Sequence, residues 1–541
     1  MSTKTAPDAE THESWLPMVV IAMGQMLMSF NVAAIPVSMS GMVERFQTAP
    51  TTVGTAIVMY SLGVSGFVML GAKLGQRLGV KTFFQIAVAM FLCAMVLMVL
   101  APTASLMLAA QGLAGLAGAS LVPTLVALIA NHYRGKQQAK AVGLLGSARA
   151  IAGVLAFVTV GFLAAIDYRL GFGLLIVHAA AILLMSLKLK PTPGNPDVKI
   201  DGMGVVLAAL GIIAITFGFN NLRGWGAVLA SAAAPFNVMG VSPAPLLIVV
   251  GAAIVMAFFG WSHRVAKRGG TPLIDLRVVD SPREWATAFA LFIIVGTEAA
   301  INFAVPLYIQ IVQGRAPGAT SIAMMPFMLT VFFTALLVVR LYDKFSPRFI
   351  ARWAFALVII GTLWLAFVAS NNWSVAPVIL GLIIVGLGQG ALVTLLFNVL
   401  VTESPRELAG DVGSLRGVTQ NLAAAVGTAV MGTLMVAVLS AGVLGKVYDN
   451  PKITAEMKEL VDFDRINFLN NDRLKERFEN TGATTEQVAE AVRINSETRL
   501  RALKTGFVFL AALSVLALVP CGWLPGFKPG DIPPGAVPKK A

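Results

Sequence analysis

One acidic residue lies in the middle of a long apolar run, where ionised groups are rare. Glu298 stands in the stretch GTEAAINFAVPLYIQ and is the only charge between Trp285 and Val312. A charge at the centre of a lipid bilayer costs from about 2.5 to more than 10 kcal/mol, depending on how it is measured, so such a group faces water or a partner. We therefore expect Glu298 to face an internal passage, where it binds a proton or a cationic group of a ligand.

A second charge, Arg149 in GSARAIAG, is the most deeply placed basic residue. At 1.5 Å per residue it lies about 12 Å into its apolar run, and Glu298 lies about 20 Å into a run of the same direction. We expect Arg149 to be the counter-ion of Glu298 or to bind an anionic head group. Desolvation favours a neutral carboxyl group and a nearby arginine favours the carboxylate, so an acid that moves between these settings carries a proton. In the alternative, Glu298 stays hydrogen-bonded to neighbouring side chains and only fixes helix packing.

The composition places these charges in a membrane protein. Hydrophobic residues make up 57% of the chain and charged residues 12%, against about 25% charged in ordinary soluble domains. Apolar stretches near the roughly 20 residues that cross the hydrocarbon core recur along the whole chain. They predict an all-α protein with fourteen membrane spans, at residues 15–39, 52–72, 82–101, 104–131, 141–164, 170–188, 202–221, 245–262, 285–312, 321–339, 350–370, 375–402, 411–441 and 505–524.

The formal charge of +13 is explained by orientation in the membrane. Lys and Arg collect in the short loops after the even-numbered spans, so the positive-inside rule predicts that both termini are cytoplasmic, in a multi-pass protein of a bacterial inner membrane. A soluble basic module is absent from the sequence, which argues against nucleic acid as a partner. Phosphate-binding loops and metal-ligand spacings are absent too, so we expect no cofactor, no metal and no enzymatic activity.

One long charged loop, residues 446–504, interrupts the pattern of short connections. It predicts a hairpin of two helices, with Thr484 and Gln487 as a capping box that opens the second helix. The hairpin follows the thirteenth span, and an odd number of crossings from a cytoplasmic N-terminus places it outside the cytoplasm. It either covers the external mouth, binds an extracytoplasmic partner, or is a solvated spacer.

A loop signature occurs twice, as AKLGQRLGVK from Ala72 to Lys81 and as RLYDKFSPR from Arg340 to Arg348. Both copies resemble the G-x-L-x-D-R-x-G-R-K loop of the major facilitator superfamily. Their recurrence implies two six-helix halves, residues 15–188 and 285–524, with two extra linker helices in residues 189–284 and cytoplasmic tails at 1–14 and 525–541. The segments AVPLYIQIVQG, GLGQGALVTLLFNVL and GSLRGVTQNLAAAVGTAVMGT resemble the fourteen-helix drug:proton antiporter branch of that superfamily.

The resemblance implies a gate made of charged loop residues, and it also reveals departures from the family pattern. Gln76 replaces the family's acidic residue, Gln111 stands where the family has an arginine linked to proton coupling, and Leu27 stands where this branch carries an aspartate. The fifth span, with GVLAFVTVG, lacks the branch's proline. The gating residues implied are Lys73, Gln76, Arg77, Asp343, Lys344, Arg348 and Arg416.

Polar side chains at mid-span are candidates for binding a substrate. Asn and Gln also link helices in membranes, so each has a structural alternative. The candidates are Asn31, Gln111, His178, Asn302, Gln310, Gln389, Asn398 and Gln420.

Three functions are compatible with this sequence. The first is a secondary transporter that exports drug-like or amphiphilic molecules in exchange for protons. The second is an uncoupled carrier of lipids, amphiphiles or metabolites, which the altered Leu27, Gln76 and Gln111 favour. The third is a membrane sensor or scaffold that acts through the hairpin.

Overall fold

The computed structural model describes residues 14–133, 135–226, 228–231, 234–279, 281–341, 344–371, 375–403, 409–448, 450, 453, 468, 470–479 and 483–526. Within these ranges, fourteen helices are long and apolar enough to cross a membrane, which confirms the predicted number of spans and the all-α class. The predicted tails lie outside the described residues except for Ser14, Pro525 and Gly526, as does most of the first half of the hairpin, including 454–467.

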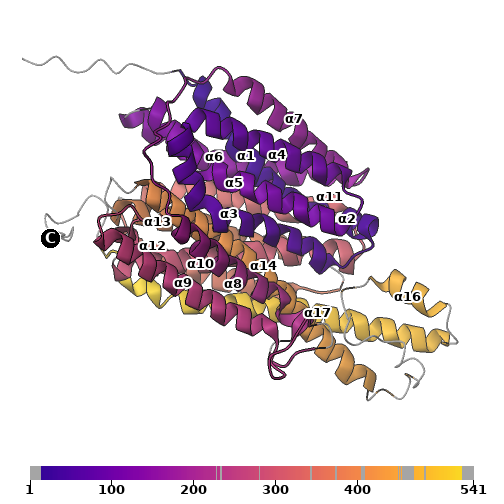
Figure 1. The fold of residues 1–541 in the computed structure, drawn as a ribbon. Helices are drawn as coiled ribbons and strands as arrows, with labels where there is room; N and C mark the ends of the chain where they lie inside the picture. The colour runs from indigo at the N-terminus through magenta and orange to yellow at the C-terminus, as the bar shows by residue number, and fades with distance from the viewer. Residues whose placement is uncertain are drawn as a thin grey trace, which may run out of the picture.

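Helices of the first half precede a linker pair, and helices of the second half follow it (Figure 1). The first half contains α1 (Leu16–Val37), α2 (Met39–Phe46), α3 (Pro50–Leu78), α4 (Val80–Leu100), α5 (Ala104–His132), α6 (Gly135–Leu163) and α7 (Tyr168–Ser186). The linker contains α8 (Gly202–Trp225), α9 (Pro243–Lys267) and the 3-10 turn η1 (Leu276–Val279). The second half contains α10 (Pro282–Pro306), the π-helix η2 (Leu307–Val312), α11 (Pro317–Leu337), η3 (Val338–Leu341), α12 (Pro347–Val368), α13 (Val375–Glu403), α14 (Ala409–Tyr448), α16 (Asn471–Glu479), α17 (Thr485–Ala517) and η6 (Pro520–Trp523).

The two halves repeat one packing scheme. The pairs α1 with α6, α3 with α5, α4 with α5 and α4 with α7 pack together in the first half. Their counterparts six spans later, apart from the linker pair, are α10 with α14, α11 with α13, α12 with α13 and α12 with α17, and these pack together in the second half. Across the halves, α3 packs on α14 and α6 packs on α11. The interface between the halves is built on these two contacts.

The linker helix α8 covers one edge of this interface. Its Phe219 packs on Val58 of α3 and on Ala425 and Ala429 of α14, so it contacts both halves at once. The close pairing of α8 with α9 depends on small residues, because a side chain at Gly251 would meet the backbone of Ile215 at 2.7 Å. The extra pair is therefore attached to the seam between the halves rather than to either half alone.

We call the end of the bundle that carries α2 and α16 the hairpin side, and the opposite end, where α3 meets α4, the loop side (Figure 1). Helix α14 runs from the loop side to the hairpin side and, at 40 residues, is longer than its predicted span. Helix α17 enters from the hairpin and continues to Ala517 in one piece, where we predicted a hairpin helix and a separate span from 505 to 524. The prediction of a break was wrong because hydropathy changes there while the backbone has no proline to interrupt it.

The structure confirms the capping box that opens this last helix. The Thr484 hydroxyl accepts from the Gln487 backbone N–H and the Gln487 side chain accepts from the Thr484 N–H. A second capping box, Ser281 with Glu284, fixes the loop-side start of α10. This box sets where the helix that carries Glu298 begins.

The crossing of α10 and α14 gives the first testable prediction. A Cβ atom at Gly427 would lie 2.3 Å from the carbonyl oxygen of Gly296, which real contacts do not allow. We expect Gly427→Ala to force the two helices apart and to destabilise the protein by about 1–3 kcal/mol, as overpacking does. The measurement is thermal unfolding of the purified protein in detergent. Gly445→Ala is the matched control on the same helix, because nothing lies within 4 Å of its Cβ position, and an unchanged melting temperature for both variants would contradict this packing.

Candidate functional site

Glu298 lies at the contact between α10 and α13 and is half-buried. Its Oε2 accepts a hydrogen bond of 2.8 Å from Nε2 of Gln389, a residue with no exposed surface. The other amide atom, Gln389 Oε1, is buried without a hydrogen-bond partner. Gln389 thus has a donor for a carboxylate and an acceptor for a protonated carboxyl group.

Four further unsatisfied polar atoms lie on α10 and α14. Thr297 Oγ1, Asn302 Oδ1, Gln420 Nε2 and Thr428 Oγ1 are buried without hydrogen-bond partners. Burying such groups unpaired is costly, and in hydrocarbon no water can replace the missing partner. The described part of the second half therefore contains buried donors and acceptors without a protein partner. Of the predicted substrate residues, Asn302, Gln389 and Gln420 belong here, and Asn398 lies further along α13.

Arg149 does not pair with Glu298, so the counter-ion arrangement that we predicted is not formed in this conformation. No hydrogen bond or ion pair of Arg149 occurs within the described part of the chain. Its charge instead acts on the Tyr60 hydroxyl of α3 and on the Arg416 guanidinium of α14. The guanidinium carbon of Arg416 lies 3.8 Å from the centroid of the Phe397 ring. Arg416, which we predicted as a gating residue, is thus part of a cationic cluster with Arg149.

Other predicted substrate residues are engaged in helix contacts within the first half. The side chains of Asn31 and Gln111 form a closed amide pair with hydrogen bonds of 2.8 and 3.2 Å, and neither has exposed surface. His178 of α7 forms a hydrogen bond of 3.0 Å with the Met23 carbonyl of α1. These contacts match the structural alternative, in which amides and a histidine link helices.

Gln310 closes the interface between the halves on the hairpin side. From η2, its Nε2 donates to the Pro36 carbonyl at 2.9 Å and to Thr320 Oγ1 at 3.0 Å. Its Oε1 accepts from the Ser40 N–H at 3.0 Å. One amide therefore ties η2 and α11 of the second half to the end of α1 and the start of α2. Gln310 was predicted to bind substrate, and in this structure its amide atoms bind protein groups of both halves. We call Gln310, Pro36, Ser40 and Thr320 the hairpin-side clamp.

Charged groups of both halves and of the linker lie within electrostatic range of one another on the loop side. Asp411, at the start of α14, interacts electrostatically with Lys73 of α3 and accepts from the Asp275 N–H of the linker. Asp275 in turn forms an ion pair of 2.6 Å with Arg277. The acid of this cluster therefore comes from α14, whereas the family loop would carry an acid at position 76. We call Lys73, Asp411, Asp275 and Arg277 the loop-side cluster.

The remaining predicted gating residues have local roles. The Gln76 side chain is exposed, and its carbonyl accepts from the Asn195 N–H at 3.0 Å; Arg77 is also exposed and its carbonyl lies beside Gly194. Arg348 Nε donates to the Leu524 carbonyl at 3.0 Å, within the second half. Lys344 is exposed, and Asp343 lies outside the described residues.

Lys81 and Arg348 hold equivalent positions in the two halves. Lys81 Nζ donates to the carbonyls of Leu187 and Leu189 at the end of the sixth span, as Arg348 does at the end of the last span. A basic side chain satisfies helix carbonyls that have no partner of their own and opposes the negative end of the helix dipole. These repeated contacts stabilise each half by itself.

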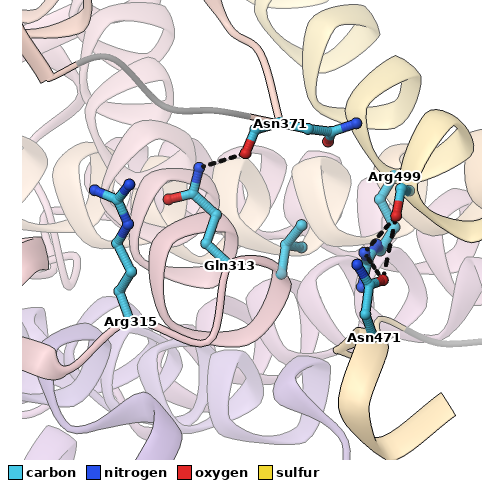
Figure 2. Close-up of a pocket in the computed structure, with 7 residues that line it drawn as sticks. Gln313, Arg315, Asn371, Asn471 and Arg499 are labelled. Carbon is cyan, nitrogen blue, oxygen red and sulfur yellow. Dashed lines mark hydrogen bonds between the residues drawn. The ribbon is translucent and has the colours of Figure 1, made fainter. Parts of the chain in front are cut away.

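A cavity of about 480 Å³ lies on the hairpin side, between the end of η2 and the hairpin (Figure 2). Gln313 Nε2 donates to the Asn371 carbonyl at 3.5 Å, and Arg499 donates to Asn471 Oδ1 at 2.5 Å. The hairpin thus forms one wall of a polar chamber next to the clamp. Its lining residues are Val312, Gln313, Arg315, Asn371, Asn471, Ser496 and Arg499.

Sequence reasoning missed Asp411, Tyr60 and Phe397. Asp411 could have been predicted from the sequence, because it is an acidic residue in the first turn of a span, on the same side of the membrane as the basic signature loops. Tyr60 and Phe397 carry no such signal, because an aromatic residue inside an apolar run is indistinguishable from ordinary packing.

Known proteins resemble this chain in sequence and in fold. The sequence profile of the Major Facilitator Superfamily matches residues 21–428. The probable actinorhodin transporter of Streptomyces coelicolor is 26% identical over 410 residues, covering 72% of this chain and 67% of that protein. The multidrug efflux pump LfrA of Mycolicibacterium smegmatis is 25% identical over 430 residues, covering 78% of this chain and 81% of that protein.

The fold matches a solved structure over almost its whole length. The crystal structure of a bacterial homologue of the human lysosomal transporter Spinster, in an inward-facing and unoccupied conformation, aligns with a TM-score of 0.60 at 14% identity. The alignment covers 95% of this chain and 98% of that one. It confirms the predicted fold class.

The hairpin-side clamp predicts an effect of Gln310→Ala. The variant loses three hydrogen bonds that each contribute about 0.5–1.5 kcal/mol, so the hairpin-side-open population should rise about tenfold or more. The measurement is maleimide labelling of Ser38→Cys, a position with no exposed surface, in a background without Cys93 and Cys521. Gln313→Ala is the control, since its contact with Asn371 is long and exposed. Equal labelling of both variants would contradict the clamp.

The loop-side cluster predicts rescue by charge exchange. Lys73→Glu should place two acids together and raise labelling of Val68→Cys, which is buried, by about 2–5-fold, as for a partly exposed ion pair. Adding Asp411→Lys should restore slow labelling. The exposed Lys344→Glu serves as the control, and a double variant that labels as fast as Lys73→Glu would rule out the interaction.

Proposed function

We propose that this chain, which belongs to the Major Facilitator Superfamily, exports amphiphilic or drug-like small molecules by alternating access. The observation that carries the proposal is the presence of the hairpin-side clamp and the loop-side cluster at opposite ends of one interface, together with unsatisfied polar groups in the helices that run between them. If the clamp and the cluster open alternately, those groups are exposed to one side of the membrane and then to the other. The name of one relative, a multidrug efflux pump, supports the direction of transport.

In this proposal the loop side faces the cytoplasm and the hairpin side faces outward. The basic residues of the short loops support that orientation by the positive-inside rule. Substrate then enters when the loop-side cluster of Lys73 and Asp411 separates. It leaves when the clamp around Gln310 opens toward the cavity beneath the hairpin.

Proton coupling belongs to Glu298 in this proposal. The carboxylate accepts from Gln389 Nε2, and a protonated Glu298 can donate to Gln389 Oε1 after a small rotation, because that oxygen has no other partner. Gln389 thus stabilises either protonation state, which a proton carrier needs. One proton moved through the membrane potential supplies about 2.3 kcal/mol per 100 mV, enough for modest accumulation.

The uncoupled carrier is the second candidate. It is favoured by Gln111, which stands at a position linked to proton coupling in the family and is occupied by Asn31 in a closed amide pair. A scaffold that acts through the hairpin is less well supported. The hairpin contacts its own neighbours, with Asn450 donating to Glu490 and Asn471 accepting from Arg499.

Glu298→Gln separates the coupled exporter from the uncoupled carrier. In proteoliposomes, a pH gradient should accelerate transport by the wild-type protein, whereas the variant should transport downhill and ignore the gradient, since an amide carries no proton. Glu44→Gln, at an exposed acid, should behave as wild type. A variant that still responds fully to the gradient would exclude Glu298 as the carrier. Wild-type flux that ignores the gradient would favour the uncoupled carrier.

A further inference from the structure

Arg149 and Arg416 lie on opposite halves of the protein at matching depths. Arg149 lies on α6 five residues beyond Leu144, where the apolar part of that helix begins, and Arg416 lies on α14 five residues beyond Asp411. Both helices run from the loop side, so the Cα atom of each arginine lies about 7–8 Å inside its span. The electrostatic interaction between the two arginines agrees with this placement. Two cations, one from each half, therefore lie within electrostatic range of each other on the loop side.

Acidic partners for these arginines are missing from the helices around them. Helices α3, α5, α6 and α11 contain no Asp or Glu. Helix α14 contains only Asp411, which is engaged by Lys73 and the linker, and α13 contains only Glu403, its last residue. Glu298 of α10 accepts from Gln389. Two like charges in a region of low dielectric repel each other and strongly favour an anion between them.

The contacts of Arg416 leave an edge of its guanidinium available. Phe397 covers one face of the guanidinium plane, with its ring centroid 3.8 Å from the guanidinium carbon. The Nε atom of Arg416 is buried and has no hydrogen-bond partner. A guanidinium stacked in this way keeps its N–H groups in the plane, where a carboxylate, sulfonate or phosphate accepts two of them at once.

Aromatic and apolar side chains lie near Arg149 and Arg416. Tyr60 is almost fully buried and its hydroxyl lies within electrostatic range of Arg149. Gly417, next to Arg416, packs against Val68 of α3 and Val122 of α5, so the arginine lies at the seam and not on the outside of the bundle. A ligand that reaches the two guanidiniums therefore also contacts apolar and aromatic surface.

We propose that Arg149 and Arg416 together bind the anionic group of the transported substrate, so that the substrate class is an anionic amphiphile: a carboxylate, sulfonate or phosphate joined to an aromatic or aliphatic body. This inference rests on the proposed export function and specifies its substrate. Because each half supplies one guanidinium, the anion removes their repulsion and draws the halves together. Binding thereby favours closure of the loop side behind the substrate.

The test uses the purified full-length protein and three probes with one pyrene body. Pyrenebutyrate is the anion, pyrenebutanol the neutral analogue and pyrenebutyltrimethylammonium the cation. We expect pyrenebutyrate to bind at least about tenfold tighter than pyrenebutanol, since one well-formed charge-assisted contact is of that order. Arg149→Gln and Arg416→Gln should each remove this preference while binding of pyrenebutanol persists, which also reports that the variants fold.

Two further variants sharpen the test. Arg416→Lys keeps the charge and should retain part of the preference for the anion, whereas Arg169→Gln, a cation at the start of α7, should leave it unchanged. Tighter binding of the cation than of the anion, or a preference that survives both glutamine variants, would overturn the proposal.

Flux measurements separate this inference from the transport function. Arginine-dependent binding of pyrenebutyrate without any flux into or out of proteoliposomes supports the anion site and contradicts export. Flux of the cation that does not depend on either arginine supports export and overturns the anion site. Phosphatidylglycerol in nanodiscs that competes with pyrenebutyrate through the same arginines would identify a lipid phosphate as the anion, and inert phosphatidylglycerol would identify a soluble amphiphile; both results support an anionic ligand.

Discussion

Hydrocarbon does not solvate charge, and this constraint organises the described structure. The chain places few ionised groups within its spans, and each of the deeply placed ones lies at a contact between helices. Glu298 receives a hydrogen bond from a buried glutamine, and Arg416 stacks on Phe397. The cost of leaving such groups in lipid is large compared with the stability of most proteins. Ionised groups inside the bundle are therefore candidates for a functional role at the interface between the halves.

The charges are separated along the path rather than paired. The cationic cluster of Arg149 and Arg416 lies on the loop side, and Glu298 with Gln389 lies deeper on α10 and α13. A substrate and a proton can then occupy different places in one passage, so that competition for a single carboxylate is not required. The contacts between the halves at the two ends differ as well, because a neutral amide bridges the hairpin side and charged groups interact on the loop side. Opening of the loop side is thus the step that salt and charge would affect most.

The sequence predicted the fold almost completely, but it did not predict which side chains contact one another. Fourteen spans, two halves and the capping box at Thr484 follow from hydrophobic length, a repeated loop and local hydrogen bonding, all of which act over short distances in the chain. Partners of individual side chains do not follow, because they depend on helix rotation about the axis. Glu298 was expected beside Arg149, and a rotation of either helix by a fraction of a turn decides between that pair and the observed one with Gln389. Gln310 illustrates the same limit, since a mid-span polar residue and a gate residue look alike until the π-helix η2 is known.

The central claim is that Glu298 faces a wet passage whose opening alternates. The most direct measurement is reaction of Glu298→Cys, in a background without Cys93 and Cys521, with membrane-impermeant and lipid-soluble maleimides added to oriented proteoliposomes. The account predicts labelling by the impermeant reagent from the loop side, with labelling from the hairpin side appearing when the Gln310 clamp is removed. Labelling by the lipid-soluble reagent alone, with or without the clamp, would contradict it.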